Sequence, residues 1–147
     1  MFTRIVVGTD GSDTAAEAVR QAIDLAKLSG AQLSIVSAFA PVPTRRVSGE
    51  QQDAPPDVQY VIGPREDVNL ILDAAAADAR KQGLEVQTHP VEDDPADAIL
   101  NVAEETNADL IVVGNKGMTG ARRYLLGSVP NNVSHHAPCS VMIVRTT

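Results

Sequence analysis

The chain has 147 residues, a single cysteine, 44% apolar but only 3% aromatic residues, and a formal net charge of −7. This length suits one domain spanning residues 1–147, with a core built from Val, Ile, Leu and Ala because Trp is absent. The charge argues against a nucleic-acid groove, one cysteine excludes an internal disulfide, and no apolar run reaches the roughly 20 residues of a membrane span. Without a signal-peptide pattern, we expect a cytoplasmic protein.

The first expected strand is the apolar run from Arg4 to Thr9, which ends in a turn at Asp10-Gly11-Ser12. Ser12 or Asp13 can cap the following helix, because Ser and Asp side chains accept hydrogen bonds from free N–H groups at a helix start. Apolar residues at helical spacing predict that helix, and Gly30 is its expected end.

Leu33 to Phe39 is the second expected strand. Residues 40–64 are rich in proline and predict a long irregular connection within the same domain. A helix is expected over Arg65 to Gln82, followed by a strand over Leu84 to Val91. The alternation of apolar and polar residues in this strand predicts a half-exposed edge strand, on which we expect His89 to be exposed.

Asp94 and Pro95 predict the start of a third helix, as its N-cap and first residue. A strand over Asp109 to Val113, a short helix over Ser128 to His136 and a strand over Ser140 to Val144 complete the chain. Alternating strands and helices predict an α/β fold, a parallel sheet with helices on both faces. Such sheets bind ligands at the carboxyl ends of strands, where the strand order reverses.

The segment GNKGMTGARRYLLGSV follows the fourth strand and carries the spacing Gly-2x-Gly-9x-Gly-Ser. Glycines let the main chain approach a ligand closely, and N–H groups in loops and at helix starts bind anions. The pattern is neither a Walker loop nor a dinucleotide fingerprint, and a purely structural turn is the alternative. We expect main-chain N–H groups, the Ser128 hydroxyl and the Lys116 ammonium to hold phosphates. The residues of this expected cradle are Gly114, Asn115, Lys116, Gly117, Gly127, Ser128 and Val129.

With these motifs the chain resembles the nucleotide-binding branch of the universal stress protein family. The resemblance also rests on VVGTDGS at Val6 to Ser12, DLIVVGNKG at Asp109 to Gly117 and CSVMIV at Cys139 to Val144. It implies a flavodoxin-like, Rossmann-like sheet of five parallel strands in the order 3-2-1-4-5 that binds ATP.

The resemblance places the adenine between the ends of the first two strands and lets Asp10 contact the nucleotide or a Mg²⁺ ion. An Asx turn is the purely structural alternative for Asp10. AMP and cyclic AMP remain open as ligands beside ATP. The residues implied at the adenine end are Gly8, Thr9, Asp10, Ala38 and Phe39. A homodimer is implied through the last strand, at Val141, Met142, Ile143 and Val144.

Two positions depart from the family pattern. Asp93, beside Asp94, replaces a common glycine. The first interpretation of the two residues is a capping pair. In the functional alternative, the second carboxylate could weaken anion binding or help hold Mg²⁺. Asn115 replaces a common Ser or Thr. We find no acid–base pair for the γ-phosphate, and therefore expect a nucleotide-binding stress or signalling protein with at most slow ATP hydrolysis. The alternatives are a cyclic-AMP-binding or sequestering protein and a ligand-free dimerisation module.

Overall fold

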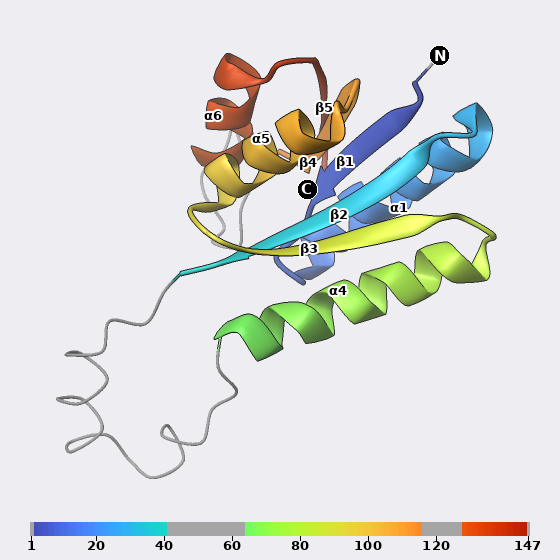
Figure 1. The fold of residues 1–147 in the computed structure, drawn as a ribbon, viewed down its shortest axis with the longest axis horizontal. Helices are drawn as coiled ribbons and strands as arrows, with labels where there is room; N and C mark the ends of the chain where they lie inside the picture. Colours follow the sequence, from blue (N-terminus) through green and yellow to red (C-terminus); the bar gives the residue numbers. More distant parts are fainter. Residues whose placement is uncertain (1, 41–63, 116–127, 147) are drawn as a thin grey trace, which may run out of the picture.

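The computed structural model describes residues 2–40, 64–115 and 128–146. Within these ranges five parallel strands form one sheet in the order β3-β2-β1-β4-β5, which confirms the predicted order (Figure 1). An irregular connection was predicted over residues 40–64, and residues 41–63 of it lie outside the described part of the chain. The strands are β1 (Arg4–Gly8), β2 (Gln32–Phe39), β3 (Val86–Glu92), β4 (Leu110–Gly114) and β5 (Ser140–Val144). The helices are α1 (Asp13–Ser29), α4 (Pro64–Lys81), α5 (Pro95–Thr106) and α6 (Ser128–His136).

β1 is the central strand, paired with β2 on one side and with β4 on the other. The chain first builds the sheet from β1 through β2 to β3, and then crosses back to add β4 and β5. The strand order therefore reverses between β1 and β4, which is the position where doubly wound sheets bind ligands.

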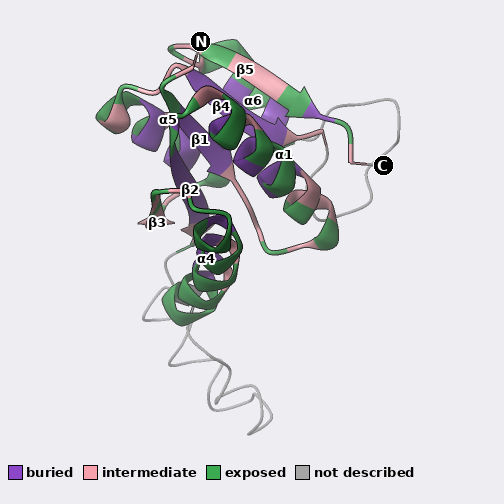
Figure 2. Ribbon diagram, turned by 90° about the vertical axis from the view of Figure 1, so that its right-hand side faces the viewer, coloured by how far each residue is buried: buried purple, intermediate pink, exposed green. Residues whose placement is uncertain are grey.

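Two apolar layers cover the two faces of the sheet. In β1, Ile5 and Val7 pack with α1 and α4, whereas Val6 packs with α5 and α6. Because both faces are covered, the central strands are continuous apolar runs rather than alternating ones. Figure 2 shows the buried residues gathered in the strands and on the sheet-facing sides of the helices, with exposed residues along the outside of α4.

The helix starts follow the caps expected from the sequence. The Ser12 hydroxyl accepts a hydrogen bond of 3.2 Å from the N–H of Ala15 at the start of α1. The Asp94 carboxylate accepts from two main-chain N–H groups at the start of α5, where Pro95 occupies the first position. These caps fix the point at which each helix leaves the carboxyl edge of the sheet. No helix in the described ranges is long and apolar enough to cross a membrane.

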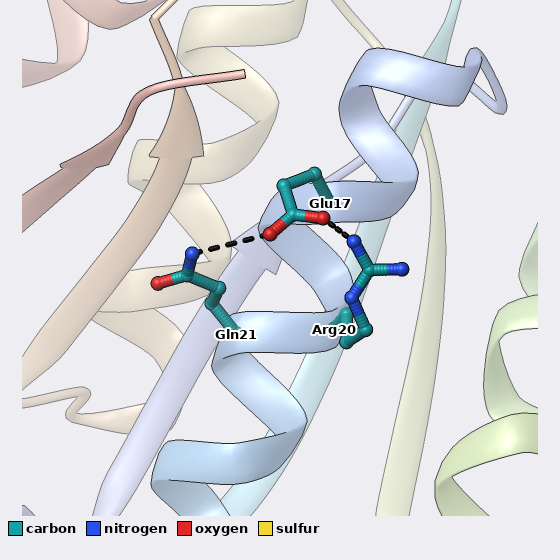
Figure 3. A network of polar contacts seen from close by, with 3 residues as sticks. All are labelled: Glu17, Arg20 and Gln21. Atoms are coloured by element: carbon teal, nitrogen blue, oxygen red, sulfur yellow. Dashed lines mark hydrogen bonds and ion pairs between the residues drawn. The ribbon is translucent and has the colours of Figure 1, made fainter.

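The outer face of α1 satisfies its charges locally. Glu17 forms an ion pair with Arg20 and accepts a hydrogen bond of 3.2 Å from the side-chain amide of Gln21 (Figure 3). Residues three and four positions apart share one face of a helix, so such contacts form within it. These polar contacts support the first turns of α1.

Asp109 ties the start of β1 to the start of β4. Its carboxylate accepts from the N–H of Thr3 at 2.8 Å, from the hydroxyl of Thr3 at 2.9 Å and from the N–H of Arg4 at 3.1 Å. Partial burial acts to raise the pKa of Asp109, but these hydrogen bonds outweigh it, so the pKa lies below its usual value. The ionised carboxylate therefore holds the two central strands together at their amino ends.

His89 in the edge strand β3 is half-buried, so the expectation that it is exposed was wrong. Its Nε2 atom is shielded from solvent and finds no hydrogen-bond partner among the described residues. His89 pairs in register with Val36, which packs in the layer formed with α5 and α6. The outer edge of β3 therefore has no partner strand in the sheet, but the face of β3 that carries His89 is covered by the layer of α5 and α6. Burial lowers the pKa of His89, and the nearby charge of Glu105 partly opposes that shift.

We expect the free energy of unfolding to decrease as the pH falls below the ordinary histidine pKa of 6.5, because folded His89 resists protonation. In that range the unfolded chain binds more protons than the folded chain, and the contribution is lost progressively down to the lowered folded pKa. Melting temperatures of wild type and His89→Gln between about pH 8 and about pH 5 measure this effect. His89→Gln should flatten the slope, while the exposed-site control His135→Gln should keep it. Equal slopes in wild type and His89→Gln would contradict the prediction.

Candidate functional site

The carboxyl ends of β1, β2 and β4 meet at one edge of the sheet. The register pairs Val7 of β1 with Ile35 of β2 and with Val112 of β4. Gly8 therefore ends β1 beside the end of β4 at Gly114, while β2 continues past β1 to Phe39. The structure thus gathers at this edge the predicted residues that end these strands.

The turn after β1 is shaped by its own polar groups. Thr9 donates its N–H to the carbonyl of Val36 at 2.9 Å, and its Oγ1 atom accepts from the N–H of Gly11 at 3.1 Å. Gly11 has a φ of +83°, a conformation that favours glycine. The turn ends at Ser12, so the N-terminal end of α1, which favours anions, begins at this edge.

Asp10 forms an Asx turn, the alternative that the sequence left open. Its Oδ1 atom accepts from the N–H of Ser12 at 2.9 Å. No cluster of three or more His, Cys, Asp or Glu side chains able to hold a metal occurs in the described part of the chain. A Mg²⁺ ion at Asp10 would need most of its oxygen ligands from phosphates and water, which is the usual manner of Mg²⁺ binding in nucleotide sites.

Ala38 and Phe39, the predicted adenine contacts at the end of β2, are half-buried. The guanidinium carbon of Arg65, in the first turn of α4, lies 5.9 Å from the centre of the Phe39 ring. A cation over an aromatic face is attracted by its quadrupole. Arg65 was not predicted at this edge, because Phe39 and Arg65 are separated by the connection between β2 and α4.

Asp93, which departs from the family pattern, and its neighbour Asp94 act as a capping pair, as first interpreted. Asp93 accepts at Oδ1 from the N–H of Asp94 at 2.8 Å and at Oδ2 from the side-chain amide of Asn101 at 3.3 Å. The N–H of Asp93 also donates to the carbonyl of Phe39 at 3.1 Å. Both carboxylate oxygens of Asp93 are therefore engaged with α5 and its cap residue, while its main-chain N–H holds this segment against the end of β2.

Asn115 has a different role from the predicted one. Its N–H, expected to face phosphate, donates to the carbonyl of Val144 in β5 at 2.8 Å. Its Oδ1 atom accepts from both the N–H and the hydroxyl of Thr146, each at 2.9 Å. Asn115 thus fastens the residue after β4 to the residues that follow β5, and that N–H is not a phosphate donor in this structure.

The remaining cradle residues divide between the described and undescribed parts of the chain. Lys116, Gly117 and Gly127 lie outside the described residues. Ser128 and Val129 begin α6, where Ser128 is exposed and Val129 is half-buried against the layer of α5 and α6. The predicted helix start at Ser128 is confirmed. Contact of these residues with phosphate stays a prediction.

Two isoleucines that the sequence did not predict at the site pack closely against glycines of this edge. A Cβ atom on Gly8 would lie 2.5 Å from Cδ1 of Ile99, and one on Gly11 would lie 2.8 Å from Cγ1 of Ile71. Both isoleucines belong to apolar helix faces, and nothing in their local pattern distinguishes them from other packing residues. The helices α4 and α5 therefore approach the turn and the end of β1 so closely that only glycine fits without a shift.

We expect Gly11→Ala to lower the free energy of unfolding by about 2 kcal/mol, about half from the positive φ and half from the contact with Ile71. Gly83→Ala is the matched control, because Gly83 has a φ of +85° and a Cβ there would meet nothing within 4 Å. That control should cost only about 1 kcal/mol. Urea unfolding of both variants tests the difference, and equal losses would show that Ile71 does not restrict Gly11.

Comparison with known proteins places this geometry in context. Residues 1–145 match the model of the universal stress protein family. The universal stress protein Rv1636 of Mycobacterium tuberculosis is 39% identical over 147 residues, which cover 99% of this chain and 98% of that protein. The crystal structure of a universal stress protein in complex with cAMP is 35% identical, with a TM-score of 0.74 and 99% coverage of both chains. A universal stress protein from Archaeoglobus fulgidus in complex with dAMP is 26% identical, with a TM-score of 0.67 and coverage of 97% and 98%.

Proposed function

The chain belongs to the universal stress protein family, and we propose that it binds an adenine nucleotide at the carboxyl edge of β1, β2 and β4. The observation that carries the proposal is the meeting of three strand ends and a helix start at the point of strand-order reversal. Full-length similarity to relatives solved with cAMP and dAMP supports an adenine nucleotide over other anions.

In the proposed complex the adenine lies near Gly8, Thr9, Ala38 and Phe39. The half-buried Phe39 ring offers an apolar surface for a base, with the Arg65 guanidinium beside it. The phosphates lie between the segment after Gly114 and the start of α6, where the positive end of the helix dipole favours anions. Local donors must provide this attraction, because the chain's net charge of −7 opposes an anion.

Isothermal titration calorimetry with ATP, AMP and cyclic AMP tests the proposal and ranks the three ligands. A dissociation constant of about 100 µM or tighter for at least one of them supports it. Native mass spectrometry of the purified protein adds a second test, in which co-purified nucleotide supports binding. An empty protein that gives no heat with any nucleotide would instead favour a ligand-free dimerisation module.

We further propose that nucleotide occupancy acts as a stress or signalling state in the cytoplasm rather than as a step in rapid catalysis. No carboxylate–histidine pair is placed at this edge by the described residues, and both Asp10 and Asp93 are engaged in turn and cap contacts. Multiple turnover of ATP at about 1 per second or faster would contradict this view. Tight binding of cyclic AMP without turnover would favour the sequestering function.

A homodimer through β5 is proposed as the assembled form. β5 is an edge strand, Ile143 is 36% exposed, and Val141 and Met142 are half-buried, so an apolar strand edge remains open for pairing. Light scattering after size exclusion should give twice the mass of one chain for wild type. Ile143→Lys should shift the mass to that of a monomer, and a wild-type monomer at all concentrations would contradict the proposal.

A further inference from the structure

A second hollow lies at the edge of the sheet opposite to the nucleotide edge. It has a volume of about 660 Å³ and is lined by residues at the amino ends of β1, β2 and β3 and at the carboxyl ends of α4 and α5. In Figure 1 this edge lies to the right, where α4 ends and β3 begins. The volume falls within the range of about 300–1,000 Å³ that small-molecule sites occupy.

The hollow is lined by a hydroxyl that the fold itself does not use. Ser34 in β2 lines it and is only 8% exposed as a residue. Its hydroxyl takes part in none of the hydrogen bonds made by the described residues. The Ser34 oxygen is not among the buried polar atoms without a partner, so solvent reaches it from the hollow. A ligand in the hollow can therefore replace water as its hydrogen-bond partner.

Charges of both signs line the same hollow in equal number. Arg4 and Arg80 contribute guanidinium groups, and Glu85 and Glu105 contribute carboxylates. In the described ranges, the only hydrogen bond from these four side chains is a long one of 3.5 Å, from Arg80 to the carbonyl of Val86. None of the four forms an ion pair with another described residue. Their charges are therefore open to a ligand.

The pattern of charge selects a ligand that carries both signs. A simple anion would meet two carboxylates and the negative carboxyl ends of two helices, and a simple cation would meet two guanidinium groups. A zwitterion can place its ammonium near the carboxylates and its carboxylate near the guanidinium groups. We propose that this hollow binds a small net-neutral zwitterion of the amino-acid class, which hydrogen-bonds to Ser34.

Calorimetry of the full chain with L-glutamine tests the proposal, with acetate and methylammonium as ions that carry one charge only. We expect saturable binding of glutamine with a dissociation constant of about 1 mM or tighter, and at least about tenfold weaker binding of the single-charge ions. No saturable heat with glutamine up to about 10 mM, or equal affinity for acetate, would overturn the proposal.

Matched variants locate the binding in this hollow. Glu105→Gln should weaken glutamine binding about tenfold, whereas Glu104→Gln, an exposed neighbour that does not line the hollow, should leave it unchanged. Ser34→Ala should weaken binding about threefold without lowering the melting temperature, because the lost hydroxyl has no partner in the fold. Equal affinities in Glu105→Gln and Glu104→Gln would overturn the assignment. A lower melting temperature in Ser34→Ala would show that the hydroxyl already serves the fold, and would also count against it.

Discussion

Gly8→Ala should lower the free energy of unfolding by about 2–3 kcal/mol, an unusually large loss for the addition of one methyl group. The new Cβ would lie 2.5 Å from Cδ1 and 3.0 Å from Cγ1 of Ile99. Neither side can move easily, because Gly8 ends the central strand and Ile99 is only 4% exposed in the layer beneath α5. Urea unfolding followed by circular dichroism measures the loss.

Combining Gly8→Ala with Ile99→Val tests whether contact with Ile99 is the cause of the loss. Valine lacks the Cδ1 atom that the new methyl would meet, so the pair approximately conserves the volume of the core. Ile99→Val alone should cost about 1 kcal/mol. The double variant should also lose about 1 kcal/mol rather than the sum of about 3–4 kcal/mol. Additive losses in the double-mutant cycle would mean that Ile99 is not what restricts Gly8.

Gly127→Val should weaken nucleotide binding by at least about 100-fold, because two lost hydrogen bonds to a charged phosphate are together worth about 3 kcal/mol or more. Gly127 lies outside the described residues and directly precedes Ser128 in the chain, where α6 begins. A valine side chain there would occupy the space in which a phosphate meets main-chain N–H groups. Calorimetry with the tightest of the three adenine nucleotides measures the effect.

The control for this variant is Ala121→Val, which adds bulk within the same segment at a residue that is not part of the glycine pattern. Ala121→Val should bind nucleotide nearly as well as wild type. Both variants should keep the wild-type circular dichroism spectrum. A folded Gly127→Val protein with unchanged affinity would contradict the phosphate cradle, while leaving binding at the adenine end possible.

The proposed nucleotide site and the proposed zwitterion site lie at opposite edges of the same sheet, so the two proposals can be tested separately. The first depends on the ends of β1, β2 and β4, and the second on the starts of β1, β2 and β3. Failure of nucleotide binding would leave the Ser34 hollow unaffected, and loss of glutamine binding would leave the nucleotide proposal intact. Variants at Ser34 and Glu105 should accordingly retain wild-type affinity for nucleotide.

Local patterns in the sequence determined the positions of the strands and helices, the parallel sheet and the caps at Ser12 and Asp94, whereas the strand order was implied by the family resemblance. The local features depend on local chemistry: β-branched runs that favour buried strands, hydroxyl and carboxylate groups that satisfy free N–H groups, and the alternation of strands and helices that favours parallel pairing. Each of these local features can be recognised within a short window of the chain. For the same reason the start of α6 at Ser128 was predicted correctly.

Only the tertiary structure decided what each of these residues faces. It covered His89 on an edge strand, directed the N–H of Asn115 to Val144, placed Ile99 against Gly8 and left the Ser34 hydroxyl facing an unassigned hollow. These outcomes join residues that are far apart in the chain, and a local pattern reports the periodicity of a segment but not the identity of its distant neighbour. Which distant residues come into contact depends on how the helices pack against both faces of the sheet, and this packing involves the whole chain at once.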